Sequence, residues 1–120
     1  MPLTFSPCVL IPCYNHGAMM ASVLARLAPF DLPCLVVDDG SDETTRRTLE
    51  ALAADRPQVT LLRLAENSGK GAAVMQGLKA CADRGFTHAV QVDADGQHAI
   101  EDIPKLLALA GRHPDALISG

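Results

Sequence analysis

Short apolar runs and segments of helical periodicity alternate along the chain. The runs at 8–11, 34–37, 59–64 and 88–92 have the length of strands, and the first two are continuously apolar, as in strands buried on both faces. Between the runs, apolar residues recur at the three- and four-residue spacing that places them on one side of a helix. The predicted inward-facing sets are Met20, Val23, Leu24 and Leu27; Leu49, Leu52 and Ala53; Val74, Leu78 and Cys81; and Ile103, Leu106, Leu107 and Ala110.

Proline and capping residues indicate where these elements begin and end. Pro12 stops the first apolar run, and Pro29 follows the first helical set. Ser41 or Asp42 can cap the second helix, because their side-chain oxygens accept hydrogen bonds from the first turn. Pro104 suits the first turn of the last helix.

Strands that alternate with helices at this spacing predict an α/β fold, with a mainly parallel sheet covered on both faces through right-handed crossovers. Residues 116–119 look like the opening of a fifth strand. No linker, repeat or low-complexity segment interrupts residues 1–120, which we therefore interpret as a single domain. Because the chain stops as that strand begins, we expect it to be the N-terminal portion of a longer domain.

Net charge and hydropathy exclude some classes of binding partner. The chain has 10 Lys and Arg against 14 Asp and Glu, a formal net charge of −4. A surface of that sign repels phosphates, which argues against a nucleic-acid binder. Any phosphate-bearing ligand must therefore be bound by groups that attract it locally. The longest apolar runs are far shorter than the roughly 20 residues of a membrane-spanning helix. The N-terminus also lacks a secretory-signal pattern, so we expect a cytoplasmic protein.

The four cysteines carry no metal-site signature. Cys8, Cys13, Cys34 and Cys81 lie in apolar stretches or beside a turn, without a CxxC motif or paired Cys/His spacing. We interpret them as reduced, mostly buried thiols that pack as small apolar side chains. Their spacing alone indicates neither a zinc site nor a redox role.

Polar residues follow each of the first four predicted strands. They occupy 12–16, a turn at 38–41, 67–71 and 93–98. In a parallel sheet, ligands bind beyond the carboxyl ends of the strands. Four loops therefore converge on one edge, which we predict to be the ligand site.

The pair Asp93 and Asp95 is the sharpest chemical signal at that edge. Carboxylates two residues apart after an extended strand point to the same side and repel each other unless a cation lies between them. With the amide oxygen of Gln97 as a third donor, an all-oxygen set favours Mg²⁺ or Mn²⁺ over zinc. Phosphates of a substrate would complete the coordination. The alternative is a polar turn that caps the next helix.

Further polar residues suit a nucleotide. Asp38 and Asp39 can be turn and cap residues, or can accept hydrogen bonds from a base or a ribose. Lys70, preceded by Gly69 at a helix start, offers a cation and free backbone N–H groups to an anion, although the spacing is neither a P-loop nor a dinucleotide fingerprint. His16 and His98 are the candidate acid or base residues by position, with a structural loop role as the alternative.

Four motifs in this order resemble one known family. The segments at 9–15 (VLIPCYN), 36–41 (VVDDGS), 67–71 (NSGKG) and 92–98 (VDADGQH) are similar to family 2 glycosyltransferases with the Rossmann-like GT-A fold. The last segment is similar to the branch that resembles dolichyl-phosphate mannosyltransferase and acts on polyprenyl phosphates. The resemblance extends from about residue 7 to residue 120. His16 departs from it, because many members of that branch have Glu at this position.

The resemblance implies a nucleotide-diphosphosugar donor, a divalent metal and a lipid-linked or other glycosyl acceptor. It implies a donor site at Pro12, Tyr14, Asp38, Asp39, Gly69, Lys70, Asp93 and Asp95, with the metal held by Asp93, Asp95 and Gln97. Family members place the acceptor site and catalytic base beyond the metal motif, so we expect the base beyond residue 120. The resemblance also implies work in cell-envelope glycoconjugate synthesis, with peripheral contact to the cytoplasmic face of a membrane.

Two other functions fit parts of the sequence. The segment at 90–96 suits the aspartyl nucleophile of a haloacid-dehalogenase-like phosphatase, although Gln97 stands where those enzymes need a hydroxyl. The chain can also be a nucleotide-binding module without turnover. Metal-dependent binding of sugar nucleotides distinguishes the transferase from the phosphatase.

Overall fold

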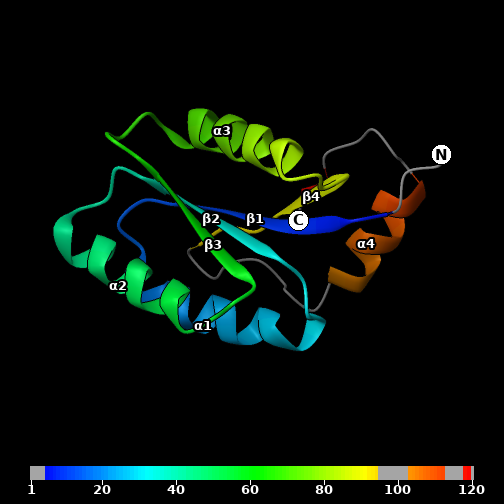
Figure 1. Cartoon of the computed structure of the whole chain (residues 1–120), viewed down its shortest axis with the longest axis horizontal. Coiled ribbons are helices and arrows are strands. Elements are labelled where there is room, and N and C mark those ends of the chain that lie inside the picture. Colours follow the sequence, from blue (N-terminus) through cyan, green and yellow to red (C-terminus); the bar gives the residue numbers. More distant parts are fainter. Residues whose placement is uncertain (1–4, 95–102, 113–117, 120) are drawn as a thin grey trace.

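The computed structural model describes residues 5–94, 103–112 and 118–119, and forms a parallel sheet with the strand order β3-β2-β1-β4-β5 (Figure 1). Every strand pair in this order is parallel. The elements are β1 (Pro7–Cys13), α1 (Gly17–Leu27), the 3₁₀ turn η1 (Ala28–Phe30), β2 (Cys34–Asp39), α2 (Glu43–Ala54), β3 (Val59–Leu64), α3 (Lys70–Asp83), β4 (His88–Gln91), α4 (Ile103–Arg112) and β5 (Ile118–Ser119). The predicted α/β fold is confirmed.

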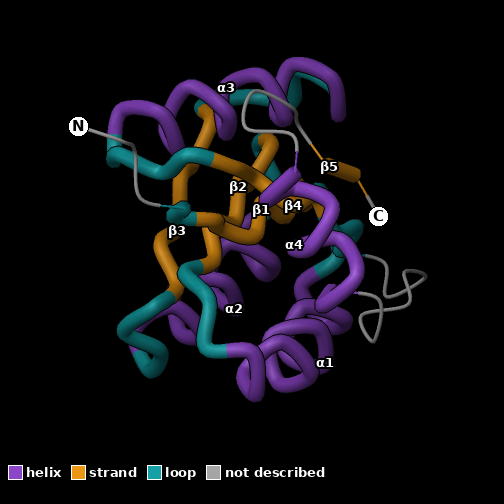
Figure 2. The backbone as a smooth tube through the Cα atoms, turned by 90° about the vertical axis from the view of Figure 1, so that its right-hand side faces the viewer, coloured by secondary structure: helices purple, strands orange, loops and turns teal. Residues whose placement is uncertain are grey.

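Helices cover both faces of the sheet, with α1 and α2 on one side and α3 on the other (Figures 1 and 2). Alternate residues of β1 enter the two apolar clusters. Val9 and Ile11 pack with α1, α2 and α4, whereas Cys8 and Leu10 pack with α3. A strand buried on both faces explains why this segment is continuously apolar.

Helical periodicity predicted the buried face of α1 in full and that of α3 in part, because Val74 and Leu78 are only partly buried, whereas Ala73, Gly77 and Cys81 are buried. Met20, Val23, Leu24 and Leu27 of α1 are all buried, as the spacing predicted. Asp42 is the residue that caps α2, because its side chain accepts a hydrogen bond from the backbone N–H of Thr45 at 2.8 Å. That hydrogen bond lowers the pKa of Asp42. It satisfies one of the backbone donors that the first turn of a helix leaves free.

Two strands extend further than the sequence predicted. β1 continues through Pro12 to Cys13, and β2 continues through Asp38 and Asp39, which we had interpreted as a turn. The carbonyl of Leu10 faces β4, where it accepts a hydrogen bond from the N–H of Val92. Pro12 faces the same side two residues later, beyond the end of β4, so its missing N–H breaks no bond with that strand.

Helix α3 packs closely against the sheet at Gly77. A Cβ atom built on Gly77 would collide with the Leu10 side chain of β1 and would crowd Val37 of β2. The absence of a side chain at Gly77 therefore permits this approach. It places the first residue of α3, Lys70, beside the carboxyl ends of β1 and β2.

Candidate functional site

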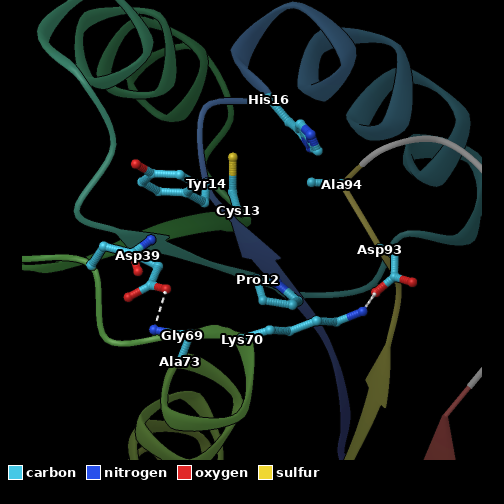
Figure 3. Close-up of a pocket in the computed structure, with 11 residues that line it drawn as sticks. Pro12, Cys13, Tyr14, His16, Asp39, Gly69, Lys70, Ala73, Asp93 and Ala94 are labelled. Carbon is cyan, nitrogen blue, oxygen red and sulfur yellow. Dashed lines mark hydrogen bonds and ion pairs between the residues drawn. The ribbon is translucent and has the colours of Figure 1, made fainter.

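A cavity of about 390 Å³ lies at the carboxyl edge of the sheet (Figure 3). The ends of β1, β2 and β4 and the start of α3 contribute its walls. The lining residues are Pro12, Cys13, Tyr14, His16, Asp39, Asn67, Gly69, Lys70, Ala73, Asp93 and Ala94. The predicted donor-site residues Pro12, Tyr14, Asp39, Gly69, Lys70 and Asp93 thus meet in one cavity.

The carboxylate of Asp39 holds the loop that precedes α3. Its two oxygens accept backbone hydrogen bonds from Ser68 at 2.8 Å and from Gly69 at 3.0 Å. Only 3% of Asp39 is exposed, and each of its oxygens keeps a second lone pair that can accept a further hydrogen bond. These hydrogen bonds to the loop were not apparent in the sequence, because Ser68 lies 29 positions from Asp39.

Gly40 allows the same loop to approach the end of β2. It has a φ of +70°, and a Cβ atom there would collide with the backbone of Glu66 and Asn67. A larger residue would therefore be strained by its own conformation and would displace the loop. Together, Asp39 and Gly40 set the position from which Lys70 reaches the cavity.

Asp38 lies outside the cavity lining. Its side chain is fully buried, and Oδ1 accepts a hydrogen bond from the N–H of Ser41 at 2.9 Å. Oδ2 lies 3.7 Å from Nη1 of Arg63 on β3 and has no hydrogen-bond partner among the described residues. The geometry gives Asp38 contacts with its own turn and with the neighbouring strand.

Asn15 joins the two loops that follow β1 and β2. Its N–H donates to Oγ of Ser41 at 2.9 Å, and its Oδ1 accepts from the N–H of Asp42 at 2.9 Å. Asn15 has a φ of 56°, a left-handed conformation that Asn tolerates better than most residues. The paired hydrogen bonds fix the backbone between Tyr14 and His16, which both line the cavity and are exposed.

An ion pair links the two sides of the cavity. Nζ of Lys70 lies 2.7 Å from Oδ1 of Asp93, and Figure 3 shows the lysine side chain reaching toward the end of β4. The Lys70 side chain is 59% exposed and that of Asp93 24%. A solvent-accessible pair of this kind contributes about 0–1 kcal/mol, so an incoming cation or anion can separate it at small cost.

The other predicted metal ligands, Asp95 and Gln97, lie outside the described residues, as does His98. Among the residues that the structure describes, no group of three or more His, Cys, Asp or Glu side chains is arranged to hold a metal ion. Asp93 is an oxygen donor of the type that Mg²⁺ and Mn²⁺ prefer. One member of the predicted metal set therefore lines the cavity.

Four of the lining residues had no individual role in the sequence analysis, although Cys13, Asn67 and Ala94 lie in the segments predicted to form the site. Cys13, Ala73 and Ala94 bring apolar surface, and Asn67 brings an amide. Burial raises the pKa of Cys13, which favours the neutral thiol. Their positions at strand ends and at a helix start were the available signal.

No helix among the described residues is both long enough and apolar enough to cross a bilayer.

Comparison with known proteins identifies what the chain is similar to. The family model described as Glycosyl transferase family 2 matches residues 8–120. Undecaprenyl-phosphate mannosyltransferase of Micrococcus luteus is 36% identical over 100 residues, which cover 82% of this chain and 41% of the relative. Polyprenol monophosphomannose synthase of Mycolicibacterium smegmatis is 36% identical over 102 residues, covering 82% of this chain and 38% of the relative. The chain thus spans about two fifths of the length of these relatives.

A solved structure shares the fold. Mannosyltransferase PcManGT from Pyrobaculum calidifontis, in complex with GDP-Man and Mn²⁺, superposes with a TM-score of 0.62 at 23% sequence identity. The match covers 80% of this chain and 29% of that chain. This likeness confirms the predicted architecture. The family match leaves the phosphatase alternative without support, since it includes the segment at 90–96.

Proposed function

The chain belongs to glycosyl transferase family 2, and we propose on that basis that it is the donor-binding portion of an enzyme that transfers a sugar from a nucleotide diphosphosugar. The observation that carries the proposal is the cavity in which Asp39, Lys70 and Asp93 converge at the carboxyl edge of the sheet. Its volume of about 390 Å³ lies within the range of small-molecule sites.

The nucleoside lies in the part of the cavity formed by Pro12, Tyr14 and Asp39. The proline and tyrosine rings supply flat apolar surface, and the free lone pairs of Asp39 can accept an N–H of the base. Asp38 supports this end from beneath, through its contacts with Ser41 and Arg63.

The diphosphate lies between Gly69, Lys70 and Asp93. The Lys70 ammonium and the first turn of α3 attract the anion, since a helix N-terminus carries unpaired N–H groups and partial positive charge. Asp93, with Asp95 and Gln97, would hold Mg²⁺ or Mn²⁺; the Mn²⁺ in the similar mannosyltransferase structure supports a divalent ion. Such an ion would supply positive charge to neutralise the leaving nucleoside diphosphate.

The acceptor in this proposal is a polyprenyl phosphate. The names of the two bacterial relatives support this class, as both contain a polyprenyl group. Such an acceptor resides in a membrane, so we place the whole enzyme in peripheral contact with the cytoplasmic face. The four free, buried cysteines are consistent with a reducing compartment.

The proposal is tested by titrating the 120-residue chain with a panel of GDP- and UDP-sugars, in Mn²⁺, in Mg²⁺ and in a chelator. A sugar nucleotide that binds should raise the free energy of unfolding by about 2.7 kcal/mol at a hundredfold excess over its dissociation constant. Most of this increase should disappear in the chelator.

Asp93→Asn should remove the metal-dependent part of the binding. Asp83→Asn, at the other end of α3, is the matched control and should bind like the parent chain. Melting without ligand shows whether each variant is folded. Absence of metal-dependent binding across the panel would refute the proposal.

A further inference from the structure

The structure brings two buried cysteines into direct contact at the other edge of the sheet. Sγ of Cys8 on β1 lies 2.8 Å from Sγ of Cys81 on α3, within hydrogen-bonding distance. The exposed fractions of the two residues are 1% and 4%. Among the residues that the structure describes, this is the one hydrogen-bonded sulfur pair. A disulfide has an S–S length of about 2.05 Å, so less than an ångström of movement would join the two atoms.

We propose that Cys8 and Cys81 form a peroxide-sensitive dithiol that closes to an intramolecular disulfide. The sequence analysis gave these residues only a packing role, because they are 73 positions apart and match no redox motif. The proposal does not depend on glycosyl transfer and stands or falls separately from it.

A second cavity gives a small oxidant access to the Cys8 side of the pair. It has a volume of about 180 Å³ and lies at the amino ends of the strands, where Cys8, Cys34, Arg84 and Phe86 contribute to its lining. This volume is several times the roughly 30 Å³ that a water molecule occupies in the liquid. Hydrogen peroxide, which is little larger than water, fits there.

The surroundings of the pair favour one thiolate. The hydrogen bond between the two sulfurs lowers the pKa of Cys81, burial raises it, and the positive charge of Arg84 lowers it. The same hydrogen bond and burial raise the pKa of Cys8, which therefore keeps its proton. The thiolate, and not the thiol, is the nucleophile in disulfide formation.

The reaction balances with hydrogen peroxide as the oxidant. The Cys81 thiolate attacks one peroxide oxygen, the O–O bond breaks, and the departing hydroxide takes a proton to leave as water. The resulting sulfenic acid is attacked by the Cys8 sulfur, which forms the S–S bond and releases a second water. Two thiols and one peroxide thus give one disulfide and two waters.

Cys34 provides the internal control. It lines the same cavity, but its S–H donates to the carbonyl of Leu32 at 3.5 Å, and burial raises its pKa to about 11. It therefore remains a neutral thiol at ordinary pH and has a backbone partner in place of a sulfur. Access alone does not distinguish Cys34 from Cys8; the sulfur neighbour does.

The bond would fasten α3 to β1. These are the two elements whose opposite ends carry Lys70 and Tyr14 to the donor cavity. A cross-link between distant positions restricts the unfolded chain, so the oxidised protein should melt at a higher temperature than the reduced protein.

The test treats the reduced, folded 120-residue chain with hydrogen peroxide, blocks the remaining thiols, and maps the peptides by mass spectrometry. We expect two of the four thiols to be lost, a Cys8–Cys81 peptide, a raised melting temperature, and full reversal by dithiothreitol. Cys34→Ala should retain all of these changes. Cys8→Ala and Cys81→Ala should each abolish the cross-link.

If a variant does not fold, the thiol count and peptide map of the parent chain alone test the proposal. Four unreacted thiols in the folded protein would overturn the proposal. So would a disulfide between other cysteines, a bond between two molecules, or oxidation confined to Cys34.

Discussion

Asp39 performs two tasks with one carboxylate. Its oxygens accept hydrogen bonds from the N–H groups of Ser68 and Gly69, and the residue also lines the cavity, with lone pairs that can accept a further hydrogen bond. In our proposal Asp39 also contacts the donor, which would link donor binding to the order of the loop. Loss of the carboxylate should therefore affect the empty protein as well as the complex.

Asp39→Asn tests this double role. The amide keeps the shape but replaces one acceptor by a donor, so either Ser68 or Gly69 loses its partner. We expect a loss of about 1–3 kcal/mol in the free energy of unfolding, because a part-buried hydrogen bond to a carboxylate is lost. Amide hydrogen exchange at Ser68 and Gly69 should accelerate.

The matched control is Asp55→Asn, at the exposed end of α2. It should change neither the stability nor the exchange of the loop. Unaltered exchange at both loop amides in Asp39→Asn would show that the carboxylate does not hold the loop.

Lys70 and Asp93 neutralise each other when no ligand is bound. A metal ion at Asp93 must compete with the lysine ammonium, whereas a diphosphate gains from it. Lys70→Gln should therefore have opposite effects on the two ligands. Affinity for Mn²⁺ alone should rise by about fivefold at most, the equivalent of a surface ion pair, while affinity for the sugar nucleotide should fall.

Paramagnetic resonance of free Mn²⁺ measures the first affinity, and calorimetry the second. Lys79→Gln, also on α3 and exposed, is the control and should leave both unchanged. A decrease in both affinities would contradict the competition between lysine and metal.

The packing of α3 on the sheet depends on one position without a side chain. Gly77→Ala would drive a methyl group into Leu10, so we expect a loss of about 1–3 kcal/mol in the free energy of unfolding from overpacking. Gly71→Ala, in the same helix, meets nothing within 4 Å and should stabilise by about 0.5–1 kcal/mol through higher helix propensity.

Urea denaturation of the two variants gives the comparison. If Gly77→Ala were as stable as Gly71→Ala, α3 would not approach the sheet as closely as the structure shows.

Strands and helices were predictable because their apolar patterns are local. Val59–Leu64 was expected as a strand and is one, and the buried face of α1 followed from its spacing. The extension of β2 through Asp38 and Asp39 was not predicted, since acidic residues are rare in strands. It depends on pairing with Arg63 and Leu64 of β3, which no local pattern encodes.

The location of the candidate site was predictable from the sequence, whereas its individual contacts were not. A parallel sheet brings its loops to one edge, so the meeting of Tyr14, Asp39 and Lys70 follows from topology. The hydrogen bonds that Asp39 accepts from the loop at 68–69 and the contact of Cys8 with Cys81 join distant positions. Such contacts depend on how the helices pack, which periodicity does not specify.

In the whole molecule, the two edges of the sheet have different chemistry. The carboxyl edge carries the charged cavity with Asp39, Lys70 and Asp93, and the amino edge carries the sulfur pair and Arg84. β1, at the centre of the strand order, reaches both. The chain covers about two fifths of the length of its curated relatives, and it contains the elements to which we assign donor binding.

Anomalous X-ray diffraction from crystals of the chain grown with Mn²⁺ and its tightest-binding sugar nucleotide tests the proposed function most directly. The account predicts a manganese peak at the carboxylate of Asp93, with the diphosphate between that ion and the ammonium of Lys70. A nucleotide bound elsewhere, or one bound in this cavity with no manganese at Asp93, would contradict it.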